Sequence, residues 1–324
     1  MPQRAPTADR LFRLASRALI SLGLLLAACS PADRDASDDT ASTPPLAGDP
    51  VVVTDLAGRT VRLAAPASRV VALLPSANDA LLAMGGGASI VARTTYDEDP
   101  RLADRPSVGG GLDPSIETLL ALSPDLVITW DGGAHDVLRT RLATAGIQTF
   151  SIGTQDTTAL LAGIQRLGQL TGHTAGADSL ARSLSAEFAA VAASVAGRAP
   201  VRVMYALSTD PPMTAGRGTF IDELIGVAGG TNAFADLTGF PPVGLEEVVR
   251  RDPDALLIPV SPGNERARLA QLRALPGWRE LRAVRDGRVV MVSSALLDRP
   301  GPTSGEAVRR IRDGLHPAVS AAGR

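Results

Sequence analysis

An internal repeat constrains the fold of this chain more than any other feature of its sequence. Residues 116–128 align without a gap with residues 245–257, and each segment carries a Glu near the start of a helical pattern, then Pro-Asp, then an apolar run. A weaker similarity relates residues 79–86 to residues 222–230. We therefore predict two similar units of structure, with a chance similarity between two amphipathic helix–strand segments as the alternative.

The alternation of short apolar runs with helical segments predicts an α/β fold with mainly parallel sheets. This alternation occupies residues 51–153 and returns over residues 199–324. Between them, apolar residues recur at helical spacing over residues 157–195, which predicts one long helix, with an interruption near Gly172 left open. We expect two similar α/β lobes joined by a rigid helix within residues 154–198, with a ligand cleft between the lobes.

The first 28 residues have the pattern of an export signal. Four arginines precede an apolar run over residues 18–28, which is too short to span a bilayer comfortably. The run ends at Leu26-Ala27-Ala28-Cys29, which resembles the lipobox of bacterial lipoproteins, and Cys29 is the only cysteine of the chain. We predict an exported protein on the periplasmic or cell-surface side, anchored to a membrane by acylated Cys29. An ordinary secretory signal with a chance cysteine is the alternative, and residues 29–50 are expected to be a disordered tether.

Composition and motifs exclude several functions. A net charge of -2 and a pI near 6.0 argue against a nucleic-acid partner. All 32 basic residues are Arg, which excludes lysine Schiff-base chemistry, and no nucleophile-elbow or zinc-protease motif is present, so we expect no enzymatic activity. His135, His173 and His316 lack metal-site spacing; Asp131, His135 and Asp136 could hold a cation, but solvated loop charges are the ordinary interpretation.

Four segments of the sequence, residues 69–76, 116–128, 220–230 and 245–258, resemble the helical-backbone class of substrate-binding proteins. Members of this class serve ABC importers of ferric siderophores, haem, cobalamin and some transition metals. The resemblance extends over residues 51–317. Local phrases at residues 96–100, 130–133, 211–216 and 298–300 are most similar to periplasmic cobalamin-binding proteins.

This resemblance implies a function. It implies a monomer without a cofactor of its own that captures a corrinoid and delivers it to a dimeric ABC permease with its ATPase subunits. Haem or a ferric siderophore is the alternative ligand. A metallo-enzyme that modifies a tetrapyrrole in the same cleft is the alternative from another class.

The resemblance also assigns residues to the site. Those expected to contact the ligand are Tyr96, Trp130, Met213, Phe240, Arg217 and Arg299. The first four would provide apolar and stacking contacts, and the two guanidinium groups would suit carboxylates, phosphates or amide oxygens of a chelate. In haem-binding relatives a loop Tyr can ligate iron, as Tyr96 could here. A Trp of the cobalamin-binding family falls at Gly111, so we expect fewer stacking contacts with the ligand here. For the predicted contact residues, the alternative is an ordinary role in a loop or at the surface.

Two glutamates occupy equivalent positions in the repeat, Glu117 in the first lobe and Glu246 in the second. In the resembling family the matching pair meets Arg residues on the two halves of the permease. We therefore predict that Glu117 and Glu246 dock to the permease. The alternative is that each merely favours the N-terminus of its helix through the helix dipole.

Overall fold

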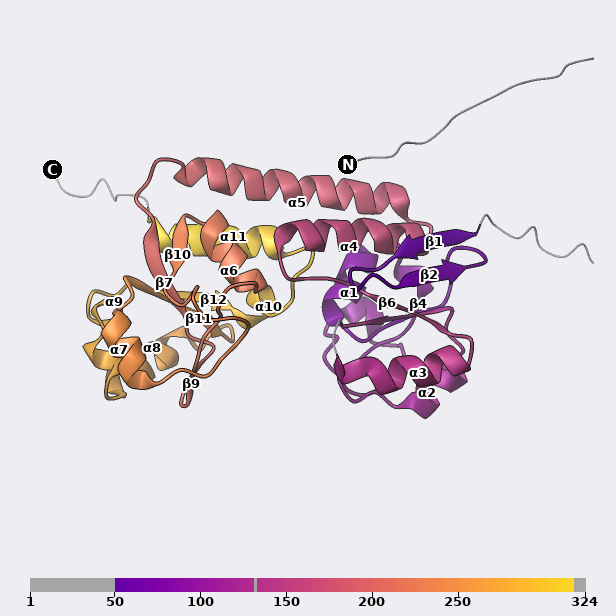
Figure 1. Ribbon diagram of the computed structural model, residues 1–324, viewed down its shortest axis with the longest axis horizontal. Coiled ribbons are helices and arrows are strands. Elements are labelled where there is room, and N and C mark those ends of the chain that lie inside the picture. Colours follow the sequence, from indigo (N-terminus) through magenta and orange to yellow (C-terminus); the bar gives the residue numbers. More distant parts are fainter. Residues whose placement is uncertain (1–49, 131–132, 318–324) are drawn as a thin grey trace, which may run out of the picture. The chain divides into compact units, whose positions relative to one another are not determined.

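The computed structural model describes residues 50–130 and 133–317 (Figure 1). The predicted signal peptide, Cys29 and the tether up to residue 49 lie outside these residues. Among the described residues, no helix is long and apolar enough to cross a membrane.

The N-terminal lobe is built on a parallel sheet with strand order β4–β3–β5–β6. An antiparallel hairpin of β1 and β2 precedes it. Its elements are β1 (Val51–Thr54), β2 (Thr60–Leu63), β3 (Val70–Ala72), α1 (Pro75–Ala83), η1 (Gly87–Ser89), β4 (Ile90–Ala92), η2 (Pro100–Leu102), α2 (Ile116–Leu122), β5 (Leu126–Thr129), η3 (Gly133–His135), α3 (Asp136–Thr144) and β6 (Gln148–Ser151). Every residue of β3 and β5 is buried, as expected for parallel strands covered on both faces.

The C-terminal lobe repeats this plan with strand order β10–β7–β11–β12, again parallel. Its elements are β7 (Val201–Tyr205), β8 (Ser208–Thr209), β9 (Pro212–Met213), α6 (Phe220–Val227), β10 (Gly230–Asn232), α7 (Leu245–Arg251), β11 (Ala255–Val260), α8 (Glu265–Ala274), η4 (Trp278–Glu280), α9 (Arg282–Arg285), β12 (Val289–Ser293), α10 (Ser294–Leu297) and α11 (Ser304–Leu315). The predicted fold class, two α/β lobes with parallel sheets, is confirmed.

The segment between the lobes, predicted as one long helix over residues 157–195, instead forms two helices, α4 (Thr157–Leu170) and α5 (Thr174–Val195), because the chain breaks at the interruption that was left open near Gly172. Gly172 has a φ of +73°, a left-handed conformation that suits glycine at a helix end. The two helices then pack closely, because a Cβ on Gly168 would lie 2.2 Å from the Cβ of Ala177. Helix α5 contacts α1 and α4 of the first half and α6 and α11 of the second (Figure 1), so it is the linking helix.

The alternation of side chains along each strand divides the core. Val70 and Ala72 of β3 belong to a large apolar cluster that also contains Val203 and Tyr205 of β7 and most of the buried apolar residues of α4 and α5. The intervening residues of the two sheets face separate clusters, one in each lobe. One continuous apolar cluster therefore connects the two sheets through α4 and α5.

The repeat found in the sequence is also a repeat of backbone structure. Helices α2 and α7 both end at a left-handed residue, Ser123 with a φ of 45° and Asp252 with a φ of 38°. Among the described residues, these two are the only non-glycine positions with a positive φ. The Pro-Asp that follows directly precedes strand β5 in one lobe and β11 in the other, as the alignment predicts.

Candidate functional site

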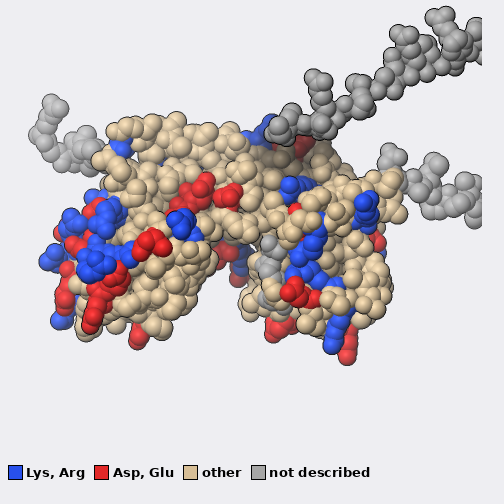
Figure 2. Space-filling view, viewed as in Figure 1, with Lys and Arg blue, Asp and Glu red and all other residues tan. Residues whose placement is uncertain are grey.

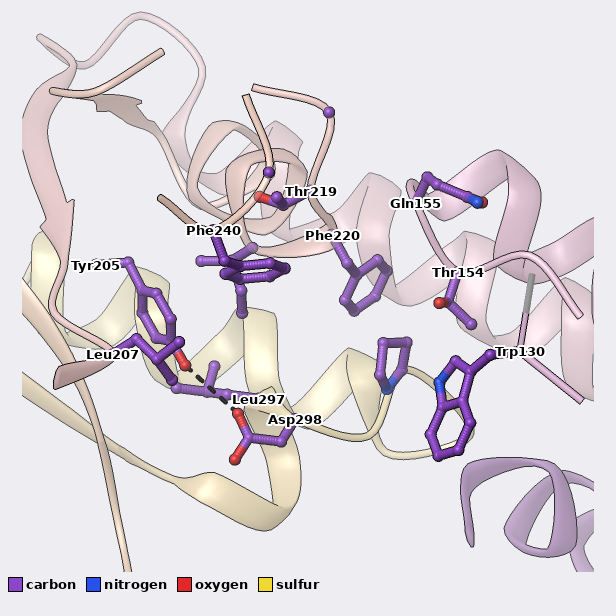
Figure 3. A pocket seen from close by; sticks show the side chains of 14 residues that line it. Trp130, Thr154, Gln155, Tyr205, Leu207, Thr219, Phe220, Phe240, Leu297 and Asp298 are labelled. Atoms are coloured by element: carbon purple, nitrogen blue, oxygen red, sulfur yellow. Dashed lines mark hydrogen bonds between the residues drawn. The ribbon is translucent and has the colours of Figure 1, made fainter. Parts of the chain in front are cut away.

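A cavity of about 430 Å³, named here the aromatic cavity, contains residues from both lobes (Figure 3). Trp130 lines it from the N-terminal lobe, and Thr154 and Gln155 line it from the segment between β6 and α4. The residues that line it from the C-terminal lobe are Tyr205, Leu207, Gly218, Thr219, Phe220, Ile221, Gly239, Phe240, Leu297, Asp298 and Pro300. Trp130 directly follows β5, and Tyr205 ends β7. The cavity therefore lies at the carboxyl ends of parallel strands, where α/β proteins commonly bind ligands.

A second cavity of about 560 Å³, named here the polar cavity, adjoins the first, because Trp130 and Asp298 line both. Its other lining residues are Pro75, Tyr96, Glu98, Ser261, Pro262, Ser293, Ser294, Ala295 and Arg299. The side chains here are more polar than those of the aromatic cavity. Together the two cavities offer a mainly apolar compartment joined to one that carries charged groups.

A buried phenol and a carboxylate pair at the wall of the aromatic cavity. The hydroxyl of Tyr205, a residue only 1% exposed, donates a hydrogen bond of 3.4 Å to Oδ1 of Asp298, drawn as a dashed line in Figure 3. Burial, with the charge of Asp298 added, raises the pKa of Tyr205 far above its ordinary value. Burial also raises the pKa of Asp298, although the bond from Tyr205 opposes this. Tyr205 is thus a protonated donor in this arrangement.

Arg299 joins the lobes at the polar cavity. Its guanidinium donates a hydrogen bond of 3.1 Å to the carbonyl oxygen of Tyr96 and lies 3.6 Å from a carboxylate oxygen of Glu98. Close by, burial raises the pKa of Asp79 to about 6; the positive charge of Arg299 opposes this rise, whereas the negative charge of Asp97 adds to it. The segment that contains Tyr96 is therefore tied to the loop after α10.

Four of the six predicted ligand contacts come together and two do not. Trp130 and Phe240 line the aromatic cavity, and Tyr96 and Arg299 line the polar cavity. Met213, half-buried in the short β8–β9 pair, and Arg217, which is exposed, line neither of these two cavities.

Other wall residues of the aromatic cavity were not predicted from the sequence. Tyr205 had a usable signal, because it ends an apolar strand of a parallel sheet. Phe220 and Leu297 had none, because an apolar residue on a short helix looks the same whether it faces the core or a cavity. Asp298 belongs to residues 298–300, one of the segments most similar to cobalamin-binding proteins, but its contact with Tyr205 is evident only from the fold.

The three histidines lie apart and have separate partners. His135 bonds to the carbonyl oxygen of Gly111, His173 to the hydroxyl of Thr171, and His316 to the carbonyl oxygen of Gly229. In the part of the chain that the structure describes, no group of three or more His, Cys, Asp or Glu could hold a metal ion. Asp136 forms an ion pair with Arg139, and Asp131 lies outside the described residues.

Glu117 and Glu246 are both exposed and occupy the same position in the first turn of α2 and α7. Three residues later, on the same helix face, stand Leu120 and Val249, which are 40% and 36% exposed. Each lobe thus presents an acid and an aliphatic side chain one turn apart. In Figure 2 side chains of both charges interleave over the region of α7 to α9, where Arg251 pairs with Asp236 and Glu247.

The fold and the cavities define a class of protein: a two-lobed α/β binding protein whose ligand cleft lies at the carboxyl ends of parallel strands. Residues 70–296 match the family described as periplasmic binding protein, and the chain belongs to that family. The predicted helical-backbone class within it is confirmed.

Three relatives illustrate the similarity. An uncharacterized ABC transporter substrate-binding lipoprotein of Bacillus subtilis is 28% identical over 309 residues, which cover 93% of this chain and 96% of that protein. The crystal structure of the periplasmic vitamin B12 binding protein of Vibrio cholerae is 27% identical, has a TM-score of 0.69, and is matched over 77% of this chain and 97% of its own. A periplasmic heme-binding protein from Roseiflexus sp. RS-1 is also 27% identical, has a TM-score of 0.66, and is matched over 76% and 99%.

Proposed function

We propose that this protein is the substrate-binding component of an ABC importer, that it captures a corrinoid, and that it delivers this ligand to the permease. The observation that carries the ligand assignment is the aromatic cavity, walled by Trp130, Tyr205, Phe220 and Phe240. A large flat macrocycle is held mainly by apolar contact and stacking, with a few polar groups to orient it. The ligand would extend into the polar cavity, where Arg299 offers hydrogen bonds to its polar substituents.

Tyr205, the tyrosine that lines the aromatic cavity, is only 1% exposed, and its hydroxyl already donates a hydrogen bond to Asp298. This arrangement is unfavourable for an iron ligand and is compatible with an apolar macrocycle packed against the wall. Haem remains the second candidate because of Tyr96, which is 61% exposed and lines the polar cavity. The similarity to both the vitamin B12 binding protein and the heme-binding protein is consistent with either ligand.

Titration of the purified mature protein with cyanocobalamin, cobinamide, hemin and a ferric siderophore, followed by absorption spectra, tests the ligand assignment. We expect a corrinoid to bind in the micromolar range or tighter. Trp130→Ala should weaken that binding by about 1 to 3 kcal/mol, the scale of a lost buried aromatic contact. Trp278→Phe is the control, because Trp278 is buried, donates its indole hydrogen bond to the carbonyl oxygen of Thr209, and lines neither cavity. Tight hemin binding with a tyrosine-ligated iron spectrum, and no corrinoid binding, would instead assign haem.

Docking through Glu117 and Glu246 is part of the proposal. A permease of two identical halves offers the same surface twice, and a carrier with two equivalent acids matches both copies. The exposed Leu120 and Val249 beside the two acids support this assignment, because a helix-capping role alone gives no reason for a matching apolar neighbour.

The membrane anchor is the third part of the proposal, and it is supported by the lone Cys29 and by the lipoprotein relative of Bacillus subtilis. Replacing Cys29→Ser should abolish acylation and move the protein from the membrane fraction to the soluble fraction. Mass spectrometry of the mature parental protein should find the mass of attached acyl chains. A Cys29→Ser protein that stays with membranes, together with a parental protein free of lipid, would contradict the anchor.

A further inference from the structure

Trp130 borders both cavities, so the direction of its indole ring determines the shape of the whole site. We propose that His135 and Gly111 position this ring before any ligand arrives, and that they thereby determine ligand affinity. The inference rests on the proposed function only in taking Trp130 as a wall of the ligand site.

His135 packs against Trp130 as a neutral ring. The ring centroids are 5.8 Å apart with an interplanar angle of 29°, and His135 is only 1% exposed. Its Nε2 lies 2.9 Å from the carbonyl oxygen of Gly111; since a carbonyl can only accept, Nε2 carries the hydrogen and Nδ1 carries a lone pair. Nδ1 is buried without a hydrogen-bond partner among the described residues, so a second proton there would find no acceptor. Burial, with Arg139 nearby, lowers the pKa of His135 accordingly.

Gly111 makes room for the indole and also holds the imidazole. A Cβ on residue 111 would lie 2.8 Å from Cζ3 and 2.9 Å from Cη2 of Trp130, and 2.4 Å from the carbonyl oxygen of Leu73. The close approach to backbone at Leu73 leaves no room for a small shift to relieve the contact. Only glycine therefore lets the indole lie in this position while its carbonyl oxygen accepts the bond from His135.

The main chain of Trp130 is fixed as well as its ring. Its carbonyl oxygen accepts hydrogen bonds of 3.3 Å from Arg139 of α3 and from the hydroxyl of Ser151, the last residue of β6. Trp130 is thus held by three segments of the lobe. Gly111 contacts its indole, the segment of His135 and Arg139 stacks on the ring and bonds to the main chain, and Ser151 bonds to the same carbonyl oxygen. Such an arrangement reduces the ordering cost of binding, because the aromatic wall is already in place.

Fluorescence can isolate this residue, because the chain has two tryptophans and Trp278→Phe leaves Trp130 as the only emitter. In that background we compare His135→Ala, which removes the ring, with His135→Phe, which keeps a ring but loses the donor. The ligand-free readouts are emission anisotropy and quenching by iodide; the binding probe is cyanocobalamin.

We expect His135→Ala to lower the anisotropy, to increase iodide quenching and to weaken cyanocobalamin binding by about tenfold, while His135→Phe keeps most of all three. Gly111→Ala should displace the indole as well, but its methyl group would also meet the backbone of Leu73. His135→Leu, which keeps apolar volume but neither the flat ring nor the donor, should therefore behave like His135→Ala and serves if that variant fails to fold. A folded His135→Ala protein with the anisotropy and quenching of its parent would overturn the positioning role. Failure of cyanocobalamin to bind even the parent would count against the proposed function alone, because the ligand-free readouts decide the positioning.

Discussion

The turn from α2 to β5 in the N-terminal lobe is closed mainly by neutral donors, whereas the equivalent turn from α7 to β11 in the C-terminal lobe is closed largely by ion pairs. Asp125 accepts hydrogen bonds from the amides of Ser68 and Arg69 and from the Ser68 hydroxyl. Its counterpart Asp254 accepts one amide bond and one from the guanidinium of Arg282.

What the two turns share is more informative than where they differ. An arginine at the first strand of each sheet, Arg69 just before β3 or Arg202 within β7, donates through its guanidinium to the last carbonyl oxygen of the helix. Its own carbonyl accepts a hydrogen bond of 2.8 Å from the amide of Asp125 or Asp254. These shared bonds fix how α2 and α7 project from their sheets. The exposed Glu on each helix is therefore held in an equivalent place, and the differences concern only the surroundings.

The largest expected effect follows from that equivalence. Replacing Glu117→Ala together with Glu246→Ala should reduce transport at least about tenfold and abolish salt-sensitive association with the permease, because both contacts with a two-fold partner are lost. Ligand affinity should stay unchanged, because neither residue lines the two cavities. Uptake of labelled ligand and pull-down at two salt concentrations are the measurements.

The single variants sharpen the comparison of the lobes. Equal losses from Glu117→Ala and Glu246→Ala would fit a symmetric partner, and Glu306→Ala on α11 is the control that removes the same charge elsewhere. A double variant that transports at the parental rate would show that the two carboxylates only stabilise their helices, a contribution of about 0.3 to 1 kcal/mol each.

The next effect concerns the stability of the two turns. Asp125→Ala should lower the free energy of unfolding by about 1 to 2 kcal/mol, since it removes three hydrogen bonds, two of them from backbone amides. Asp254→Ala should cost about 1 to 2 kcal/mol, and more of this cost should disappear at high salt, since its loss includes an ion pair. Urea denaturation at 0.05 and 1 M NaCl would separate the two. The same salt dependence for both variants would contradict the distinction between the turns.

Much of the fold could be predicted from the sequence because the signals were local. The Pro-Asp that precedes an apolar run in each half of the repeat located β5 and β11. Helix α8 (Glu265–Ala274) was missed, because this exposed, arginine-rich segment buries only Leu272 and lacks a clear apolar stripe.

The site was predicted only in part, because its walls depend on contacts between distant residues. Gly111 seemed to signal a missing aromatic side chain, but in the structure the indole of Trp130 fills the space above it. Met213 and Arg217 were assigned from the resemblance alone. In the structure both residues take part in strand pairing, Met213 with Ser208 and Arg217 with Thr238, and neither lines the two cavities. Neither outcome could be read from spacing along the sequence.

A smaller effect on stability should distinguish Asp79 from Asp222, the equivalent residues in the weaker similarity between residues 79–86 and 222–230. The pKa of Asp79 is raised from 3.8 to about 6, so its contribution to stability is complete below pH 4 and is lost as the pH rises through 6. Asp79→Asn should therefore stabilise the protein by about 1 kcal/mol at pH 7.5 and leave it unchanged at pH 4. Asp222→Asn should instead destabilise it at pH 7.5, because it removes a negative charge from the first turn of α6, where the helix dipole favours one. Thermal unfolding across this pH range provides the measurement, and a stabilising Asp222→Asn would contradict the contrast.

The smallest effect concerns the left-handed residues that end α2 and α7. A non-glycine residue in this conformation carries a steric cost that glycine avoids, so Ser123→Gly should raise the free energy of unfolding by about 0.5 kcal/mol. Asp252→Gly relieves the same cost but removes the acceptor of the Arg282 amide, a bond of 3.0 Å, and should lower the free energy of unfolding by about 0.5 kcal/mol. Asp252→Asn keeps both the acceptor and the tolerance for a positive φ and is the matched control. Urea denaturation of the three proteins should thus give opposite signs for the two glycine variants, whereas the same sign for both would mean that backbone strain outweighs the side-chain bond in each lobe.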